Sequence, residues 1–271
     1  MKSIDILVAV RNEEKSVNEF VERMNELAPN NVNINFMFLE DGSSDRTVEL
    51  LKNLSKNYNN INYISFENKY GQYAALTYGL TVSRADAVIT MDVDGGHPIE
   101  TAIEMIKSYL EGNNIVQGHR IVYYMIVGVN FFKQNVMFRL MDKSTKQKFL
   151  QHKNWWHIFK TNFRTDDGVK EIYIEYSAPE REFGESKYNF IRLLKLSYKS
   201  FFALLSLKRF IVIDLILIAL IYFFSSYVFI VLSILITMLF LLLNISYYVI
   251  VNHYPITELK IIETSITGLK R

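Results

Sequence analysis

The sequence predicts an α/β fold with a mostly parallel sheet, followed by a membrane-anchoring segment. Short apolar, β-branched segments alternate with amphipathic helical patterns from residue 4 to residue 118. This alternation is typical of a largely parallel sheet with helices on both faces. Residues 210–251 then form an apolar stretch with one charged residue, Asp214. The chain is therefore expected to combine a sheet domain with membrane helices.

The expected elements of the sheet domain follow one another in strict alternation. The strands are expected at residues 4–10, 34–39, 61–66, 87–91 and 114–118. The helices are expected at residues 17–27, 47–57, 71–82 and 99–111. Pro98 suits the first turn of the fourth helix, where its missing N–H is no loss. Gly42 permits the tight turn after the second strand.

Composition and missing motifs exclude several classes of protein. The chain has no cysteine, which excludes disulfides and thiolate metal sites. It contains neither G-x-G-x-x-G after the first strand nor G-x-x-x-x-G-K-[ST], so a glycine-rich dinucleotide fold and a P-loop are excluded. The net charge of +2 gives no sign of a nucleic-acid partner. The first residues run into a strand pattern and do not resemble a signal peptide.

Two aspartates follow the fourth expected strand. Asp92 and Asp94 are one residue apart, so their side chains are expected to point the same way. Carboxylates in this arrangement suit Mg²⁺ or Mn²⁺, which usually also bind substrate phosphates. The alternative is that the two aspartates only stabilise a turn or cap a helix. Because Glu13 and Asp41 stand at the ends of the first two strands, we expect acidic groups to gather at one edge of the sheet.

Five sequence blocks give the chain a family resemblance that extends over residues 4–251. Segments 8–14 (VAVRNEE), 39–47 (LEDGSSDRT) and 92–98 (DVDGGHP) resemble the signature blocks of family 2 inverting glycosyltransferases with the GT-A fold. Segments 138–142 (FRLMD) and 181–188 (REFGESKY) are similar to the polyprenyl-phosphate glycosyltransferases, meaning dolichol-phosphate mannose synthase and its bacterial relatives.

The resemblance implies a role for each matching position. The implied donor-binding residues are Val10, Arg11, Glu13, Asp41, Lys69, Asp92, Val93 and Asp94. Asp92 and Asp94 are the implied metal ligands, with His97 as a weaker candidate. The implied binding residues for the acceptor phosphate are Arg120, Arg139, Ser186 and Lys187. Asp94 and Arg139 are the expected catalytic residues, although Arg139 and Lys187 can also be read as ordinary surface charges.

The chain departs from the family pattern at three places. Gly96 stands where the family usually has a metal-binding Gln, and residues 68–69 (NK) replace a usual Arg-Asn. The segment between Arg120 and Phe138 is shorter than is typical, and in the family it helps to cover the acceptor site. The missing Gln and the short segment motivate the alternative of a non-catalytic member that binds lipid-linked sugars.

The C-terminal third is expected to attach the protein to a membrane. Residues 1–190 would form the glycosyltransferase domain, with a nucleotide-sugar half to about residue 120 and an acceptor half at 121–190. Residues 191–209 carry three cations on one helical face, typical of an interfacial helix, although a helix packed on the domain is the alternative. Residues 210–251 are long enough for two spans, with a buried soluble hairpin as the alternative. Positively charged residues flank this stretch on both sides, which predicts that both termini lie in the cytoplasm, with residues 252–271 as a tail. The expected protein is therefore a multi-pass protein of the cell membrane with its catalytic domain in the cytoplasm.

The sequence therefore predicts an inverting hexosyltransferase that uses a nucleotide sugar, a divalent cation and a polyprenyl (undecaprenyl) phosphate in cell envelope polysaccharide synthesis. UDP-glucose or UDP-N-acetylglucosamine is favoured as donor, and GDP-mannose comes next. Association into a homo-oligomer stays open. One alternative is a non-catalytic member that binds lipid-linked sugars, and another is a transferase that acts on a glycan or a membrane protein.

Overall fold

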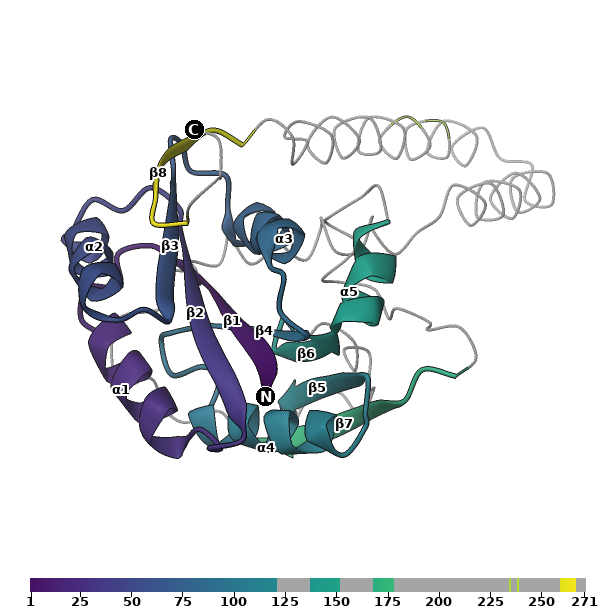
Figure 1. Ribbon diagram of the computed structural model, residues 1–271. Coiled ribbons are helices and arrows are strands. Elements are labelled where there is room, and N and C mark those ends of the chain that lie inside the picture. The colour runs from purple at the N-terminus through teal and green to yellow at the C-terminus, as the bar shows by residue number, and fades with distance from the viewer. Residues whose placement is uncertain (121–136, 152–167, 178–233, 235–237, 239–258, 267–271) are drawn as a thin grey trace. The chain divides into compact units, whose positions relative to one another are not determined.

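The computed structural model describes residues 1–120, 137–151, 168–177, 234, 238 and 259–266 (Figure 1). The chain divides into two compact units, one made of residues 1–185 and 256–271 and the other of residues 186–255. Of the second unit only Ile234 and Met238 are described, both in helical conformation. The expected interfacial helix, the rest of the two expected spans, and Ser186 and Lys187 lie outside the described residues. Within the described ranges, no helix combines the length and the apolar character needed to cross a bilayer.

A single sheet organises the first unit. Its strands lie in the order β7-β5-β6-β4-β1-β2-β3-β8. The strands are β1 (Lys2–Val10), β2 (Val32–Glu40), β3 (Ile61–Phe66), β4 (Ala87–Met91), β5 (Ile115–Arg120), β6 (Arg139–Asp142), β7 (Glu171–Tyr176) and β8 (Ile261–Thr264). The helices are α1 (Val17–Leu27), α2 (Thr47–Asn57), α3 (Gln72–Val82), α4 (Ile99–Leu110) and α5 (Lys143–Leu150). The pairs β1–β2, β1–β4, β2–β3 and β5–β7 are parallel, so the prediction of a mostly parallel α/β sheet is confirmed.

Helices cover both faces of the sheet, as the buried character of the strands predicts. On one face, α1, α2 and α4 pack on a core that contains Phe20, Phe36 and Phe38. On the other face, α3 and α5 pack on a core that contains Leu39, Phe66 and Phe149 (Figure 1). The three rings of the first core lie within 6.1–6.4 Å of one another. Because both faces of the central strands are buried, their sequences are nearly continuous runs of apolar residues.

Two antiparallel strands depart from the simple alternation. β6 enters between β4 and β5, with Arg139 opposite Thr90 on one side and Gln117 on the other. β8 pairs antiparallel with β3 at the edge of the sheet (Figure 1). Part of the segment expected to be a tail, residues 252–271, is therefore a strand of the first unit.

Candidate functional site

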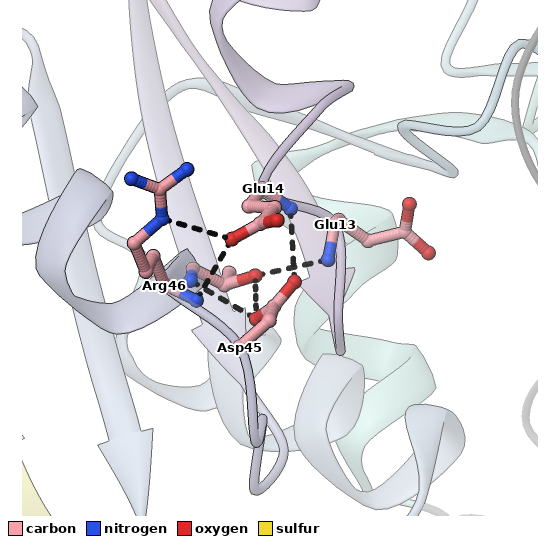
Figure 2. A network of polar contacts seen from close by, with 5 residues as sticks. Glu13, Glu14, Asp45 and Arg46 are labelled. Carbon is pink, nitrogen blue, oxygen red and sulfur yellow. Dashed lines mark hydrogen bonds and ion pairs between the residues drawn. The ribbon is translucent and has the colours of Figure 1, made fainter.

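The loops that follow β1 and β2 are joined by reciprocal hydrogen bonds. Glu14 N–H donates to the Asp45 carboxylate over 3.3 Å, and the Glu14 carboxylate accepts from Arg46 N–H over 3.0 Å. Glu13 N–H donates to the Thr47 hydroxyl over 2.9 Å. Figure 2 shows the Glu13 carboxylate directed away from this network, while Glu14, Asp45 and Arg46 face one another. The network thus fixes the loop backbone and leaves the Glu13 side chain outside it.

Asn12 adds a second link between the same loops. Its φ of 56° lies in the left-handed region, which Asn tolerates better than most residues. In this conformation its side-chain oxygen accepts from Ser44 N–H over 2.8 Å, and its own N–H donates to the Ser43 hydroxyl over 3.0 Å. The loops at the ends of β1 and β2 are therefore joined into one rim of the sheet.

Asp41 lies in this rim and reaches the start of α3. Its carboxylate accepts hydrogen bonds from the backbone N–H groups of Tyr70, at 2.6 Å, and Gly71, at 2.9 and 3.0 Å. Burial raises the pKa of Asp41 above its ordinary value, while those N–H groups and the nearby cations Lys69 and Arg11 act to lower the pKa. The structure therefore brings together three of the residues expected to bind the donor: Arg11, Asp41 and Lys69.

Asp92 and Asp94 occupy the turn between β4 and α4. The Asp92 carboxylate accepts a hydrogen bond from the Gln72 side-chain amide, which anchors it to α3. The Asp94 carboxylate accepts from Gly96 N–H over 3.0 Å. Both aspartates are partly exposed, and Val93 between them is buried. The two carboxylates thus stand in one short turn at the carboxyl end of β4. In the sheet order β4 neighbours β1, and β1 neighbours β2.

Gly96 has a specific steric role in this turn. A Cβ atom on Gly96 would lie 3.0 Å from Oδ1 of Asp94, closer than an ordinary van der Waals contact. The present turn therefore requires glycine or a small displacement of Asp94. Where the family usually has Gln, this chain has Gly96, whose backbone N–H donates a hydrogen bond to the Asp94 carboxylate.

The ring of His97 contacts both the backbone of the turn and a neighbouring aromatic side chain. Nδ1 accepts a hydrogen bond of 2.8 Å from Asp92 N–H, so this nitrogen is engaged with the backbone. The ring stacks on Phe138 with 4.6 Å between centroids. These contacts support a structural role for His97. That His97 binds a metal stays a prediction.

Arg139 is buried, with 3% of its surface exposed, so the alternative of an ordinary surface charge is wrong. One of its terminal nitrogens donates to Gln117 over 2.9 Å, and the guanidinium lies 5.7 Å from the Phe149 ring centroid. Among the described residues, Nε of Arg139 has no hydrogen-bond partner. Arg120 ends β5, on the strand that also carries Gln117.

A cavity of about 340 Å³ opens beside the Asp92–Asp94 turn. Its wall includes Ser16, which precedes helix α1, and Phe20 of that helix. Ser177, the residue after β7, also lines it. Arg23 of α1 and Glu100 of α4 also line it, and their ion pair is 2.5 Å long. The cavity gives a bound molecule access to the carboxylates from the α1–α4 face.

The donor set fits a hard divalent cation that brings ligands of its own. Asp92 and Asp94 offer carboxylate oxygens, which Mg²⁺ and Mn²⁺ prefer. In the ranges that the structure describes, no three or more His, Asp or Glu side chains are grouped to hold a metal. Mg²⁺ is commonly bound by one or two carboxylates together with substrate phosphates and water. The two carboxylates of this turn therefore fit a cation whose other ligands come from a bound diphosphate and water.

Several residues of this region were not expected from the sequence. Gln72 anchors Asp92, Gln117 pairs with Arg139, and Tyr70 binds Asp41 through its backbone. The position of Gln72 in the first turn of a helix close to the acidic edge is a signal that could have found it. Gln117 carries no such signal, because its partner comes from a strand that was not predicted.

Comparison with known proteins decides the family. The family described as glycosyl transferase family 2 matches residues 5–169, which contain the three acidic turns. The chain belongs to glycosyl transferase family 2. This result confirms the family resemblance drawn from the sequence blocks.

The relatives agree with this assignment. The chain is 30% identical over 216 residues to the uncharacterized glycosyltransferase YkcC of Bacillus subtilis, covering 71% of this chain and 65% of that protein. It is 26% identical over 220 residues to the undecaprenyl-phosphate 4-deoxy-4-formamido-L-arabinose transferase of Photorhabdus laumondii, covering 73% and 66%. The chain thus spans slightly less than two thirds of these relatives.

The fold is also found in solved structures. Glucosyl-3-phosphoglycerate synthase of Mycobacterium tuberculosis, crystallised with Mn²⁺, UDP and phosphoglyceric acid, superposes with a TM-score of 0.55 at 14% identity. The match covers 75% of this chain and 77% of that one. At this identity the likeness establishes the fold alone.

Proposed function

We propose that the protein is a membrane-anchored inverting glycosyltransferase that moves a hexose from a nucleotide sugar to a polyprenyl phosphate. The observation that carries the proposal is the gathering of Glu13, Asp41, Asp92 and Asp94 at the ends of neighbouring strands in one sheet. A relative named for undecaprenyl phosphate supports the acceptor. UDP-glucose or UDP-N-acetylglucosamine is the favoured donor, with GDP-mannose next.

The donor would lie across the rim formed by the ends of β1, β2 and β4. Arg11, Asp41 and Lys69 would bind its nucleoside, because they lie together beside the start of α3. Asp92 and Asp94 would hold Mg²⁺ or Mn²⁺ with the donor diphosphate. When bound, the cation supplies positive charge that stabilises the leaving diphosphate. The fold shared with a synthase crystallised with Mn²⁺ and UDP supports this arrangement.

The acceptor phosphate is already anionic, so the reaction needs no general base from the protein. One phosphate oxygen would form a bond to the anomeric carbon while the bond from that carbon to the diphosphate breaks and its electron pair leaves with the nucleotide. A single displacement of this kind inverts the anomeric centre. Arg139, with Lys187, would orient the phosphate. A buried guanidinium favours a nearby anion, because a cation removed from water lacks compensating charge.

The membrane attachment of the protein is part of the same proposal. Residues 191–209 would lie in the interface and residues 210–251 would form two spans, which would bring the domain to the cytoplasmic face of the cell membrane. An acceptor with a polyprenyl chain stays in the bilayer, so an enzyme fixed at its surface meets the phosphate directly.

The test is incubation of membranes that contain the protein with a panel of labelled nucleotide sugars and polyprenyl phosphate, with and without a chelator. We expect label in the organic extract that depends on the added lipid and disappears with chelator. Label that stays in the aqueous or protein fraction would support a glycan or protein acceptor instead. Tight donor binding without any labelled product would favour the non-catalytic alternative.

A further inference from the structure

The loop between β3 and α3, residues 67–71, is held on its inner side by Asp41. Tyr70 N–H donates to the Asp41 carboxylate over 2.6 Å, and Gly71 N–H donates to both of its oxygens. Gly42 faces the backbone of Lys69 in the same loop. The loop therefore ties the end of β2 to the start of α3.

The outer side of the same loop is held by a segment almost 200 residues away in the chain. Glu67 N–H donates to the Lys260 carbonyl over 2.8 Å. Lys260 N–H donates in turn to the phenol oxygen of Tyr70 over 3.3 Å. Tyr70 thus uses its backbone to bind Asp41 and its hydroxyl to bind the residue that precedes β8.

The Tyr70 side chain is fixed between these two partners. Its ring packs edge-on against Phe66, with 6.0 Å between centroids and 85° between planes. Tyr78 packs against Phe66 in the same manner, at 5.6 Å and 90°. A displacement of the Tyr70 hydroxyl would therefore be passed to its backbone rather than absorbed by a free rotation.

The segment that contains Lys260 is itself anchored to β3. Glu263 accepts from the Tyr63 hydroxyl over 2.9 Å and forms an ion pair of 2.5 Å with Lys52. Ser265 accepts from Tyr63 N–H over 2.9 Å. These contacts, together with the β3–β8 pairing, give the end of the chain a defined place on the sheet edge.

We propose that Tyr70 is a positioning residue for the nucleotide-sugar site, through which the docking of residues 259–266 fixes Asp41 and the loop that carries Lys69. This inference rests on the proposed function, in which Asp41 and Lys69 bind the donor. In sequence, residues 186–255 separate the two parts of the first unit. The nucleotide site thereby depends on the return of the chain to the sheet.

Two matched variants test the inference. Tyr70→Phe removes only the hydroxyl that accepts from Lys260, and Tyr78→Phe removes the hydroxyl of the other ring on Phe66. The full-length proteins are compared by hydrogen exchange at the amides of residues 70 and 71, by the Kd of UDP with Mn²⁺, and by kcat and KM. Tyr70→Phe should speed exchange and raise Kd and KM by roughly threefold to tenfold, the effect of one hydrogen bond, with kcat nearly unchanged. Tyr78→Phe should change none of these.

The exchange rates and the nucleotide affinities test different parts of the inference. Unchanged exchange in Tyr70→Phe would overturn the inference, whatever the nucleotide result. Faster exchange with an unchanged Kd would show that the attachment exists but does not position the site, which also overturns it. If the unmodified protein bound neither UDP nor GDP, the proposed function would fail, while the exchange data would still decide whether Tyr70 joins Asp41 to the C-terminal segment.

Discussion

Gln117 accepts a hydrogen bond of 2.9 Å from Arg139, and both side chains are buried. The Gln117 amide donates in turn to Glu171, which also accepts from the Tyr173 hydroxyl over 3.2 Å. Burial lowers the pKa of Arg139 to about 10, and the nearby Glu171 and Tyr173 act in the opposite direction. Arg139 therefore remains charged at neutral pH, and a polar chain across β6, β5 and β7 supports that charge.

Replacing Gln117 by Leu should destabilise the protein strongly. The change leaves the buried guanidinium without its acceptor, which costs about 2 kcal/mol in the free energy of unfolding. Denaturant unfolding followed by circular dichroism measures the loss. Gln147→Leu on the exposed side of α5 is the matched control and should change the free energy by less than about 0.5 kcal/mol. Equal effects of the two changes would contradict a supporting role for Gln117.

Asp94→Asn should remove transfer and leave the fold intact. The amide oxygen of Asn can still accept from Gly96 N–H, so the unfolding free energy should stay within about 0.5 kcal/mol. The lost negative charge should lower the transfer rate by at least about a hundredfold. Asp86→Asn, at the opposite end of β4, is the control and should keep transfer. Retained activity in Asp94→Asn would refute the proposed metal role.

The cation should bind weakly until a nucleotide diphosphate is present. The turn supplies two carboxylates, and Mg²⁺ and Mn²⁺ complete their coordination with substrate phosphates and water. Titration of Mn²⁺, followed by the loss of its free electron paramagnetic resonance signal, should show at least about tenfold tighter binding with UDP than without it. Asp92→Asn should abolish this difference. Equally tight binding in the absence of UDP would point to a site made by the protein alone.

Asp45 should contribute to stability in a manner that depends on pH. Burial acts to raise its pKa, but hydrogen bonds from the Thr47 hydroxyl and backbone N–H outweigh burial, and the pKa lies below the ordinary 3.8. An acid with a lowered folded-state pKa stabilises the fold above its unfolded-state pKa and loses this contribution as the pH falls through the folded value. Asp45→Asn should therefore cost about 1 kcal/mol at pH 7. The cost should shrink below pH 3.8, and unfolding curves that differ equally at pH 7 and pH 3 would contradict this expectation.

Local pattern was sufficient to predict the half of the sheet that carries the donor residues. The helices Val17–Leu27 and Thr47–Asn57 have the expected bounds, because their apolar residues recur at helical spacing and face the core. The strands at 61–66 and 87–91 also match, since they are apolar runs between clear turn signals. The meeting of the acidic turns followed from parallel order alone, because parallel strands end at one edge.

Strands β6 and β8 were not predicted, because their place in the sheet depends on pairing with strands far away in the sequence. β6 and β8 have four residues each, and their partners are chosen by register and not by a pattern within the segment. β8 pairs with a strand about 200 residues earlier, on the far side of a long apolar stretch. The burial of Arg139 depends on β6, so its surroundings could not be derived before that strand was placed.

Strand β6 runs antiparallel to both β4 and β5, so β6 starts at the same end of the sheet at which β5 ends. β5 runs toward the acidic edge, and β6 starts at Arg139 opposite Thr90, two residues before Asp92. The end of β5 and the start of β6 therefore both lie at the end of the sheet where Asp92 and Asp94 follow β4. The register of β6 is set by its pairing with β4 and β5, so a change in the length of the connection that precedes Arg139 would not by itself alter that register.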